Sequence, residues 1–363
     1  MKDILKLYLL PGVLLSGLIG ILSMGFAAKL PWLTNHGLSV LTIALLLGIL
    51  LGNLPVFRLL AASCLSGVQF SKQRLLRLGI ILYGFRLTFQ DVVGVGVLGL
   101  LIDLFMILST FGLAIFLGVR YLKLDRNTAI LIGIGNSICG AAAILAAEPV
   151  IDAPSEKVSV AISTVVIFGT ISIFAYPMIY GFSQLYLTAL VSPSVFGIYI
   201  GSSVHEVAQV LAAASAIGDN VADTAVIAKM VRVMLLGPFL IGLSAYLIFS
   251  DKVKDSEDRT ALGNSSVMPA MSFGSTIPWF ALFFVLMIAI NSLKIFPDSW
   301  RSSLVQADDL LLATAMAALG MTTHLLSIFR AGMKPLQLAA LLFLWLVLGG
   351  AFISLTMTYL WSS

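Results

Sequence analysis

The stretch "GSSVHEVAQVLAAA" (201–214) decides how this chain is interpreted. It is an alanine-rich apolar segment, yet it carries five polar or ionisable side chains, which are Ser202, Ser203, His205, Glu206 and Gln209. The whole chain is 60% apolar and only 10% charged. Ionisable residues inside such segments are costly, and they mark functional sites more often than structural ones.

The composition around this stretch indicates a polytopic membrane protein. The chain has 363 residues and a mean hydropathy of +1.06, and apolar runs recur from end to end. Each run is long enough to cross a hydrocarbon core about 30 Å thick. Eleven spans are predicted, with approximate limits 9–28, 38–54, 75–90, 96–118, 127–149, 157–182, 196–217, 222–249, 276–293, 308–328 and 336–361.

Lysine and arginine predict the orientation of these spans. With the N-terminus in the cytoplasm, fourteen of them fall in inside segments and four in outside loops. This bias predicts a cytoplasmic N-terminus and an outside C-terminus. It also explains the formal charge of +4 without nucleic acid as a partner. Residues 1–363 form a single transmembrane domain, in which the polar stretch 250–275 is expected to be a cytoplasmic linker between two halves.

A second segment repeats the pattern of the first. "GNSICGAAAILAAE" (135–148) lies 66 residues earlier and matches 201–214 at six of fourteen positions, including the G-x-S start. Glycine beside small polar residues suits a break in a membrane helix. Below a break, a new half-helix exposes N–H groups with partial positive charge, which can bind an anion. Paired discontinuous helices are a recurring way to build a transport site.

The direction of the two segments leaves alternatives open. By the predicted count both run the same way, with one span between them, whereas an inverted repeat needs opposite directions. Either 196–217 is re-entrant, or the inverted partner of 127–149 is 308–328.

Several ionisable residues lie at membrane depth. His205 and Gln209 share a helix face, whereas Glu206 points elsewhere and could carry a proton. Lys229 and Arg232 share a face of a later span. These two cations could attract an anion, neutralise an acidic residue such as Glu206 or Asp103, or cap the carbonyl ends of broken helices. Asp103 is expected to be paired, and Arg86 to reach the outer interface or line the pathway.

An enzyme is not expected. "HEVAQ" (205–209) resembles the zinc motif HExxH, but Gln209 replaces the second histidine ligand. Cys139 has only glycine and alanine neighbours and therefore no local base to activate it. The two cysteines fit neither a disulfide framework nor a zinc pattern. No metal and no cofactor are predicted.

Three motifs together resemble the YeiH-like bacterial membrane protein family, described as sulfate exporters. They are "GIGNSICGAAAI" (133–144), "GSSVHEVAQVLAAA" (201–214) and "KMVRVMLLGP" (229–238). The family is grouped with the cation–proton antiporters and anion transporters. The resemblance implies an inverted-repeat fold with two crossing discontinuous helices, in which a transport core moves against a scaffold.

The resemblance also implies the site. Substrate binding is expected from eight residues, which are Asn136, Ser137, Cys139, Gly140, Ser202, Ser203, His205 and Gln209. Coupling or charge balance is expected from Glu206, Lys229 and Arg232. The first broken segment has no carboxylate at mid-depth, which argues against simple Na⁺/H⁺ exchange and toward an anion.

The sequence thus predicts a secondary active transporter in the bacterial inner membrane, working by alternating access. The expected substrate is a small anion such as sulfate, sulfite or an organic sulfonate, and the expected coupling ion is a proton or sodium. The alternatives are a sodium- or proton-coupled organic anion symporter and a cation/proton antiporter. The bilayer is the expected environment, and a homodimer is left open.

Overall fold

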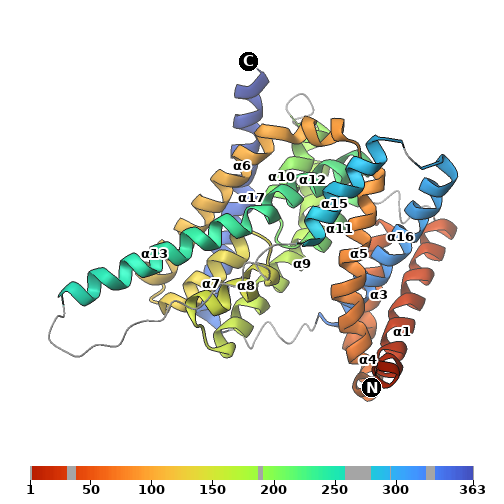
Figure 1. Ribbon diagram of the computed structural model, residues 1–363, viewed down its shortest axis with the longest axis horizontal. Coiled ribbons are helices and arrows are strands. Elements are labelled where there is room, and N and C mark those ends of the chain that lie inside the picture. Colours follow the sequence, from red (N-terminus) through yellow and green to blue (C-terminus); the bar gives the residue numbers. More distant parts are fainter. Residues whose placement is uncertain are drawn as a thin grey trace.

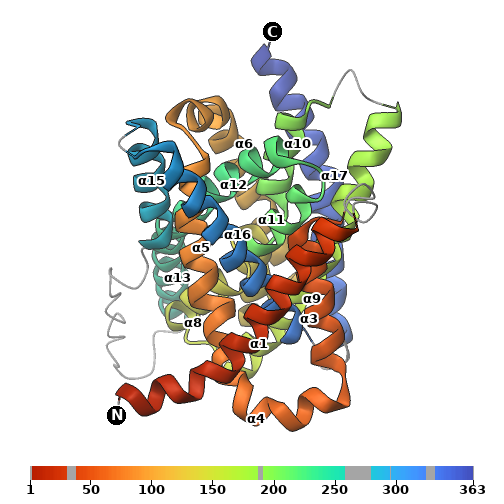
Figure 2. The same cartoon turned by 90° about the vertical axis from the view of Figure 1, so that its right-hand side faces the viewer.

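The fold is all-helical in the part of the chain that the structure describes (Figures 1 and 2). The computed structural model describes residues 2–30, 38–186, 191–257, 279–294, 296–323 and 332–362. The two termini lie at opposite ends of the molecule (Figure 1). The end near the N-terminus is called the lower face below, and the end near the C-terminus the upper face.

The helices are bounded as follows: α1 (Lys2–Lys29), α3 (Val40–Asn53), α4 (Pro55–Phe70), η1 (Ser71–Leu75), α5 (Leu76–Tyr83), η2 (Gly84–Arg86), α6 (Phe89–Ile115), η3 (Phe116–Tyr121), α7 (Arg126–Ser137), α8 (Ala141–Ile151), α9 (Ser155–Tyr186), α10 (Pro193–Ser203), α11 (Val207–Ser215), α12 (Asp219–Met234), α13 (Leu236–Glu257), α15 (Trp279–Ser292), α16 (Asp298–Met321) and α17 (Met333–Ser362).

Six helical segments among the described residues are long and apolar enough to cross a membrane. They are Leu9–Lys29, Phe89–Tyr121, Ser155–Leu185, Asp219–Ala245, Ser299–Met321 and Met333–Leu360. Shorter apolar helices, such as α3 and α15, complete the molecule. The predicted all-α polytopic membrane protein is confirmed at this level, whereas the count of eleven spans is not.

The helices form two bundles that lie side by side (Figures 1 and 2). The first contains α1, α3, α4, α5, α15 and α16, and the second contains α6 to α12 and α17. Glycines bring helices of the first bundle into close contact. A Cβ on Gly48 of α3 would lie 2.2 Å from the Ala317 carbonyl oxygen of α16. Small residues allow this approach in the membrane, where packing rather than water exclusion holds helices together.

The predicted span 127–149 is wrong as a full crossing, because the chain reverses within it. Helix α7 ends at Ser137, and Gly140 has φ +70° and ψ −134°, a conformation that favours glycine. Helix α8 then runs back along α7, so that Ile144 packs against Gly135. The segment is therefore a re-entrant hairpin that enters from the lower face and returns to it.

A salt bridge confirms that both ends of this hairpin lie on one face. Lys157, in the first turn of α9, places its Nζ 2.5 Å from Oδ1 of Asp125, which caps the start of α7. Partial burial alone would raise the pKa of Asp125, but hydrogen bonds from Lys157 and Thr128 outweigh it and lower that pKa below its ordinary value. The pair is therefore ionised at neutral pH.

The segment 196–217 is also re-entrant, which was one of the two alternatives. Helices α10 and α12 run parallel and in register, because a Cβ on Gly197 would lie 2.9 Å from the Val221 carbonyl and one on Gly201, four residues on, 2.5 Å from the Ala225 carbonyl. Since α10 and α12 therefore begin at the same upper face, α11 must carry the chain back to that face between them. The other alternative, 308–328, falls on α16, whose described residues form one continuous helix in the other bundle.

Two boundaries differ from the prediction. The predicted span 75–90 is the end of a longer helical run that begins at Pro55, interrupted by a single π turn at η1. The predicted linker 250–275 begins as helix, because α13 continues to Glu257, and the rest of it lies outside the described residues.

Candidate functional site

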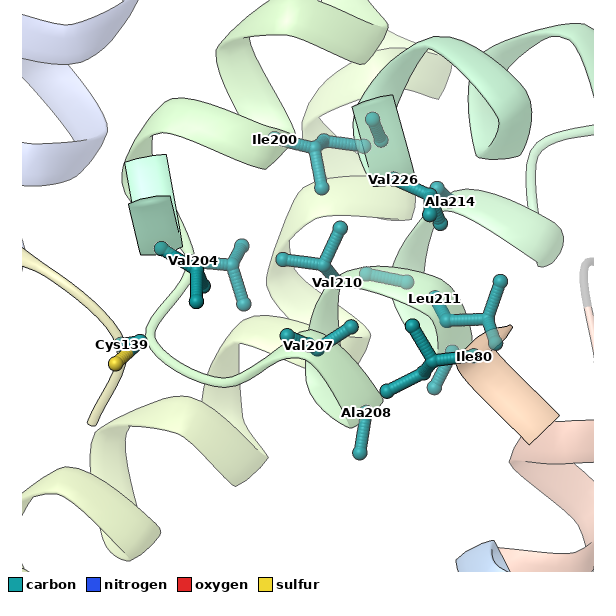
Figure 3. Close-up of a cluster of buried hydrophobic side chains, with 14 of the residues drawn as sticks. Ile80, Cys139, Ile200, Val204, Val207, Ala208, Val210, Leu211, Ala214 and Val226 are labelled. Atoms are coloured by element: carbon teal, nitrogen blue, oxygen red, sulfur yellow. The ribbon is translucent and has the colours of Figure 1, made fainter. Parts of the chain in front are cut away.

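The tips of the two hairpins meet in the interior of the second bundle. The two breaks are equivalent at the spacing of 66 residues found in the sequence. Helices α7 and α10 end at Ser137 and Ser203, respectively. Helices α8 and α11 begin at Ala141 and Val207, respectively. Figure 3 shows Cys139 and Val204 on the two facing breaks. Apolar packing surrounds the second break, where Ile80 of α5 lies near Ala208 and Leu211.

Lys229 of α12 joins the two breaks. Its Nζ donates to the Ile138 carbonyl at 2.8 Å and to the Val204 carbonyl at 2.6 Å. These acceptors occupy equivalent positions at the ends of α7 and α10, where helix carbonyls lack intrahelical partners. The Lys229 side chain is fully buried. One ammonium therefore satisfies a pair of equivalent carbonyls, one from each hairpin.

Arg232 joins the same two helix ends one turn further along α12. Its Nε and Nη2 donate to the Ser137 carbonyl at 2.8 and 2.5 Å, and Nη2 also reaches the Asn136 carbonyl at 3.1 Å. Its Nη1 donates to the Ser202 carbonyl, the equivalent of Asn136 in the other hairpin. Of the roles open to these two cations, capping of broken helices is the one observed. Among the described residues, neither forms a salt bridge.

The predicted polar residues lie on both tips and are almost completely buried. Nε2 of His205 lies 2.7 Å from Oδ1 of Asn136, which links the hairpins through side chains. The amide of Asn136 also donates to the Ile132 carbonyl at 2.7 Å. The hydroxyls of Ser137 and Ser203 instead bond backward, to the carbonyls of Gly133 and Tyr199 in their own helices. Such local bonds leave these two serines less able to bind a ligand.

Glu206 lies across the tip of the first hairpin. Its Oε1 accepts from the Ala141 N–H at 3.4 Å, so the carboxylate occupies the start of α8, where a helix favours negative charge. Glu206 is also the residue that caps α11, and its own N–H donates to Oε1 of Gln209 at 3.0 Å. The two half-helix N-termini are thus served by one internal carboxylate.

Several buried polar atoms at the tips have no hydrogen-bond partner. They are Oγ of Ser202, Nδ1 of His205, Nε2 of Gln209 and both carboxyl oxygens of Asp103. Native structures leave few buried polar atoms unpaired, so such a group of them needs an explanation. The hydroxyl and the amide can donate to an anionic ligand, whereas the carboxyl oxygens of Asp103 cannot unless the carboxyl is protonated.

Asp103 was expected to be paired, and the structure contradicts this. It lies on α6, fully buried, with no salt bridge and no partner at normal hydrogen-bond distance, and the Ser202 hydroxyl is the one side chain that acts on it as a weak donor. The groups whose charge or dipole acts on it are the Arg232 guanidinium, the Ser202 hydroxyl and the Lys229 ammonium. The sequence shows an acidic residue in an apolar span, but nothing in it places that residue beside the hairpin tips.

The larger cavities lie elsewhere, near the upper face. One of about 430 Å³ lies between the two bundles and is lined by Tyr83, Arg86, Asp219, Asp223, Arg301, Ser302 and Val305. A neighbouring cavity of about 390 Å³ is lined by the starts of α6, α10 and α12. None of the predicted site residues lines either cavity. The hairpin tips are therefore closed off from these cavities in this conformation.

Polar contacts join the bundles at this level. The Tyr83 hydroxyl of α5 donates to Oδ1 of Asp223 on α12 at 2.8 Å. Arg86 forms salt bridges with Asp308 at 3.1 Å and with Asp309 at 2.5 Å, both within the first bundle. Arg86 therefore reaches the level of the upper cavity, close to where it was expected, but with its charge already neutralised.

Comparison with known proteins agrees with the predicted resemblance. A family model described as "Conserved hypothetical protein 698" matches residues 11–339. A UPF0324 membrane protein of Pseudomonas aeruginosa is 52% identical over 346 residues, covering 95% of this chain and 94% of that protein. The UPF0324 inner membrane protein YeiH of Escherichia coli is 48% identical over 347 residues, covering 96% of this chain and 94% of that protein. No solved structure matches the chain. The chain belongs to the YeiH-like family of UPF0324 membrane proteins.

Proposed function

We propose that this protein is a secondary active transporter of a small anion, with its binding site at the tips of the two hairpins. The observation that carries the proposal is the pair of buried cations, Lys229 and Arg232, whose hydrogen bonds all go to backbone carbonyls. Full positive charges in a low-dielectric interior require compensation.

Approximate charge counting at the tips leaves one positive charge over. Each helix end carries roughly half an elementary charge, so the C-termini of α7 and α10 contribute about −1 and the N-termini of α8 and α11 about +1. Glu206 offsets the N-termini, and the two C-termini offset one of the two cations. With Asp103 uncharged, an excess of about +1 remains, which would attract an anion.

The arrangement of helices supports alternating access. One unit is helix α6 with the α7–α8 hairpin, and the other is helix α9 with the α10–α11 hairpin. The two units start 66 residues apart, and their hairpins enter from opposite faces. We infer that they form the inverted repeat implied by the family resemblance. Repeats of this kind surround a site at mid-membrane and rock against a second bundle. The first bundle, α1 to α5 with α15 and α16, would be the scaffold.

The corrected hairpins keep the predicted orientation and strengthen it. Because the α7–α8 hairpin returns to the lower face, Lys157 moves from the predicted outside set to the side of Arg126, among the inside residues. We therefore retain a cytoplasmic N-terminus and an outside C-terminus in the bacterial inner membrane.

The charge excess supports an anion as the substrate, and the family resemblance suggests a sulfur oxyanion. A sulfur oxyanion such as sulfate or sulfite could use the free Ser202 hydroxyl and Gln209 amide as donors. The runner-up is an organic anion symporter driven by sodium or protons. A cation/proton antiporter fits less well, because Asn136, Ser137 and Cys139 occupy the first break without a carboxylate.

Uptake by purified protein in proteoliposomes tests the proposal. Radiolabelled sulfate, sulfite, thiosulfate and a dicarboxylate should be compared, with and without a sodium or proton gradient. We expect one of these anions to be taken up, and His205→Ala and Glu206→Gln to slow that uptake at least tenfold. Glu156→Gln, on the first turn of α9, is the matched control and should transport normally. Normal transport by both site variants would show that the site is misplaced.

A further inference from the structure

We propose that Asp103 is a membrane-buried proton-binding site, and that its proton is bound and released together with the anion at the hairpin tips. The juxtaposition that points to this is a carboxyl with no partner at normal hydrogen-bond distance, fully buried on α6, beside two cations that bond only to carbonyls. The proposal rests on the proposed function. It gives Asp103 the proton-coupling role for which the sequence suggests His205 or Glu206.

The hydrogen bonds at the site show that Arg232 does not serve Asp103 in this structure. All of the guanidinium bonds go to the carbonyls of the two hairpins, with none to the carboxyl. A buried carboxylate whose only donor is one weakly placed hydroxyl is strongly disfavoured, whereas a neutral carboxyl is tolerated. The neutral, protonated form is therefore the one compatible with this arrangement.

Within the described part of the chain, Asp103 is the acidic residue on α6 that lies beside the two cations. Helix α12 supplies Arg232 and Lys229 and carries Asp219 and Asp223 near its upper end, whereas α10 supplies the Ser202 hydroxyl and carries Tyr199. At the lower end of α6, η3 carries Arg120 and Tyr121. Among the other helices packed against α6, α15 has no ionisable residue in its described range, and α7 carries one only in its first turn, as Arg126. Helix α17 carries Lys334 and Tyr359 near its two ends. At the tips, Nε2 of His205 is bonded to Asn136 and Glu206 accepts the Ala141 N–H, so we assign the coupled proton to Asp103.

The charge excess explains why proton and anion are linked. With Asp103 protonated the tips hold about +1 and attract an anion, whereas with Asp103 ionised the carboxylate neutralises the same excess. Release of the proton to water leaves a carboxylate that competes with the anion for Arg232 and Lys229. Linkage is reciprocal, so each ligand raises the affinity for the other. Since both would cross together, an inward proton gradient would favour uptake rather than export.

The test needs one measurement without a ligand and one with a ligand. Infrared spectroscopy of the purified protein reads the protonated-carboxyl band. We expect a band that disappears in Asp103→Asn and persists in Asp152→Asn, a matched change at an exposed residue. Asn mimics the neutral carboxyl, so Asp103→Asn should fold and keep its thermal stability. An unchanged band, or a variant that does not fold, would overturn the proton site.

The second measurement is binding of sulfate and of thiosulfate, whose charges stay fixed over the pH range used. It is read as a ligand-dependent rise in melting temperature at a mildly acidic and a mildly alkaline pH. Affinity of the unchanged protein should fall by up to about tenfold per pH unit, as one linked proton requires. Asp103→Asn should bind at both pH values with equal affinity. The same pH dependence in both proteins would overturn the linkage. If neither anion binds at either pH while the Asp103 band is present, the proposed anion specificity fails and the proton site stands.

Discussion

Replacing Arg232 with lysine would keep a positive charge at the hairpin tips and remove the fork that joins them. The guanidinium makes four hydrogen bonds to the carbonyls of Asn136, Ser137 and Ser202. A lysine nitrogen carries three donors at one point and cannot reproduce the planar geometry. Lys229 shows that one ammonium at this site reaches two carbonyls, so we expect Arg232→Lys to keep two of the four bonds and to lose the other two.

The cost can be estimated from those two bonds. Hydrogen bonds to charged groups contribute about 1.5–3 kcal/mol each, so the loss is at least about 3 kcal/mol. This corresponds to a change of roughly a hundredfold in the unfolding equilibrium. The carbonyls left without a donor lie in the interior, where water cannot replace it.

Chemical unfolding in a mild detergent measures this loss. The matched control is Arg120→Lys, which changes an exposed arginine of η3 and should alter the free energy of unfolding by less than about 0.5 kcal/mol. If Arg232→Lys were as stable as Arg120→Lys, the hairpins would not depend on Arg232, and the role assigned to it here would be refuted.

Two further substitutions test the first hairpin and the contact between bundles. Gly140→Ala should destabilise the protein by about 1–3 kcal/mol, because φ is +70° and the new Cβ would lie 2.6 Å from Cγ of Glu206. Gly181→Ala, in α9 with open space around it, should be neutral or stabilising, and equal unfolding free energies for the two variants would contradict the hairpin geometry. Tyr83→Phe removes the 2.8 Å hydrogen bond to Asp223 and should speed alkylation of Cys139 from the upper face in a Cys64→Ala background. Tyr121→Phe, an exposed control, should leave that rate unchanged. If Tyr83→Phe were alkylated no faster than the Cys64→Ala parent, this bond would not hold the bundles together.

The repeat could be predicted from the sequence because local chemistry fixes where a helix breaks. Glycine and small polar residues at 135–140 and 201–206 end α7 and α10 at equivalent positions, as their spacing of 66 residues predicts. The direction of the chain after each break could not be predicted. Hydropathy reports only that a run is apolar, and a hairpin of two short helices is as apolar as one span. Two re-entrant hairpins replaced two predicted crossings, so α9, between them, runs opposite to its predicted direction, whereas the helices from α12 onward keep theirs.

The partners of the buried charges were equally invisible in the sequence. The i, i+3 spacing of Lys229 and Arg232 predicts that they share a face, and that prediction is met. Their observed role, capping of the helix ends, depends on contacts with two hairpins that come together from opposite faces. The sequence does not show those contacts. Asp103 belongs to the same case, because the sequence does not show that the Arg232 bonds go to carbonyls and none of them to Asp103.

The pairing of the two breaks also explains why Glu206 has no acidic counterpart in the first copy of the repeat. Gly140 and Glu206 are equivalent positions, and the structure places them against each other, since a Cβ on Gly140 would lie 2.6 Å from Cγ of Glu206 and 3.2 Å from Oε1. Equivalent residues that meet in this way compete for one volume. A side chain on one hairpin therefore requires glycine on the other. Glu206 fills this shared space and reaches the Ala141 N–H of the opposite hairpin. A single carboxylate thus serves both half-helices, and a second copy at position 140 would add a clash and a repulsive charge without a further partner.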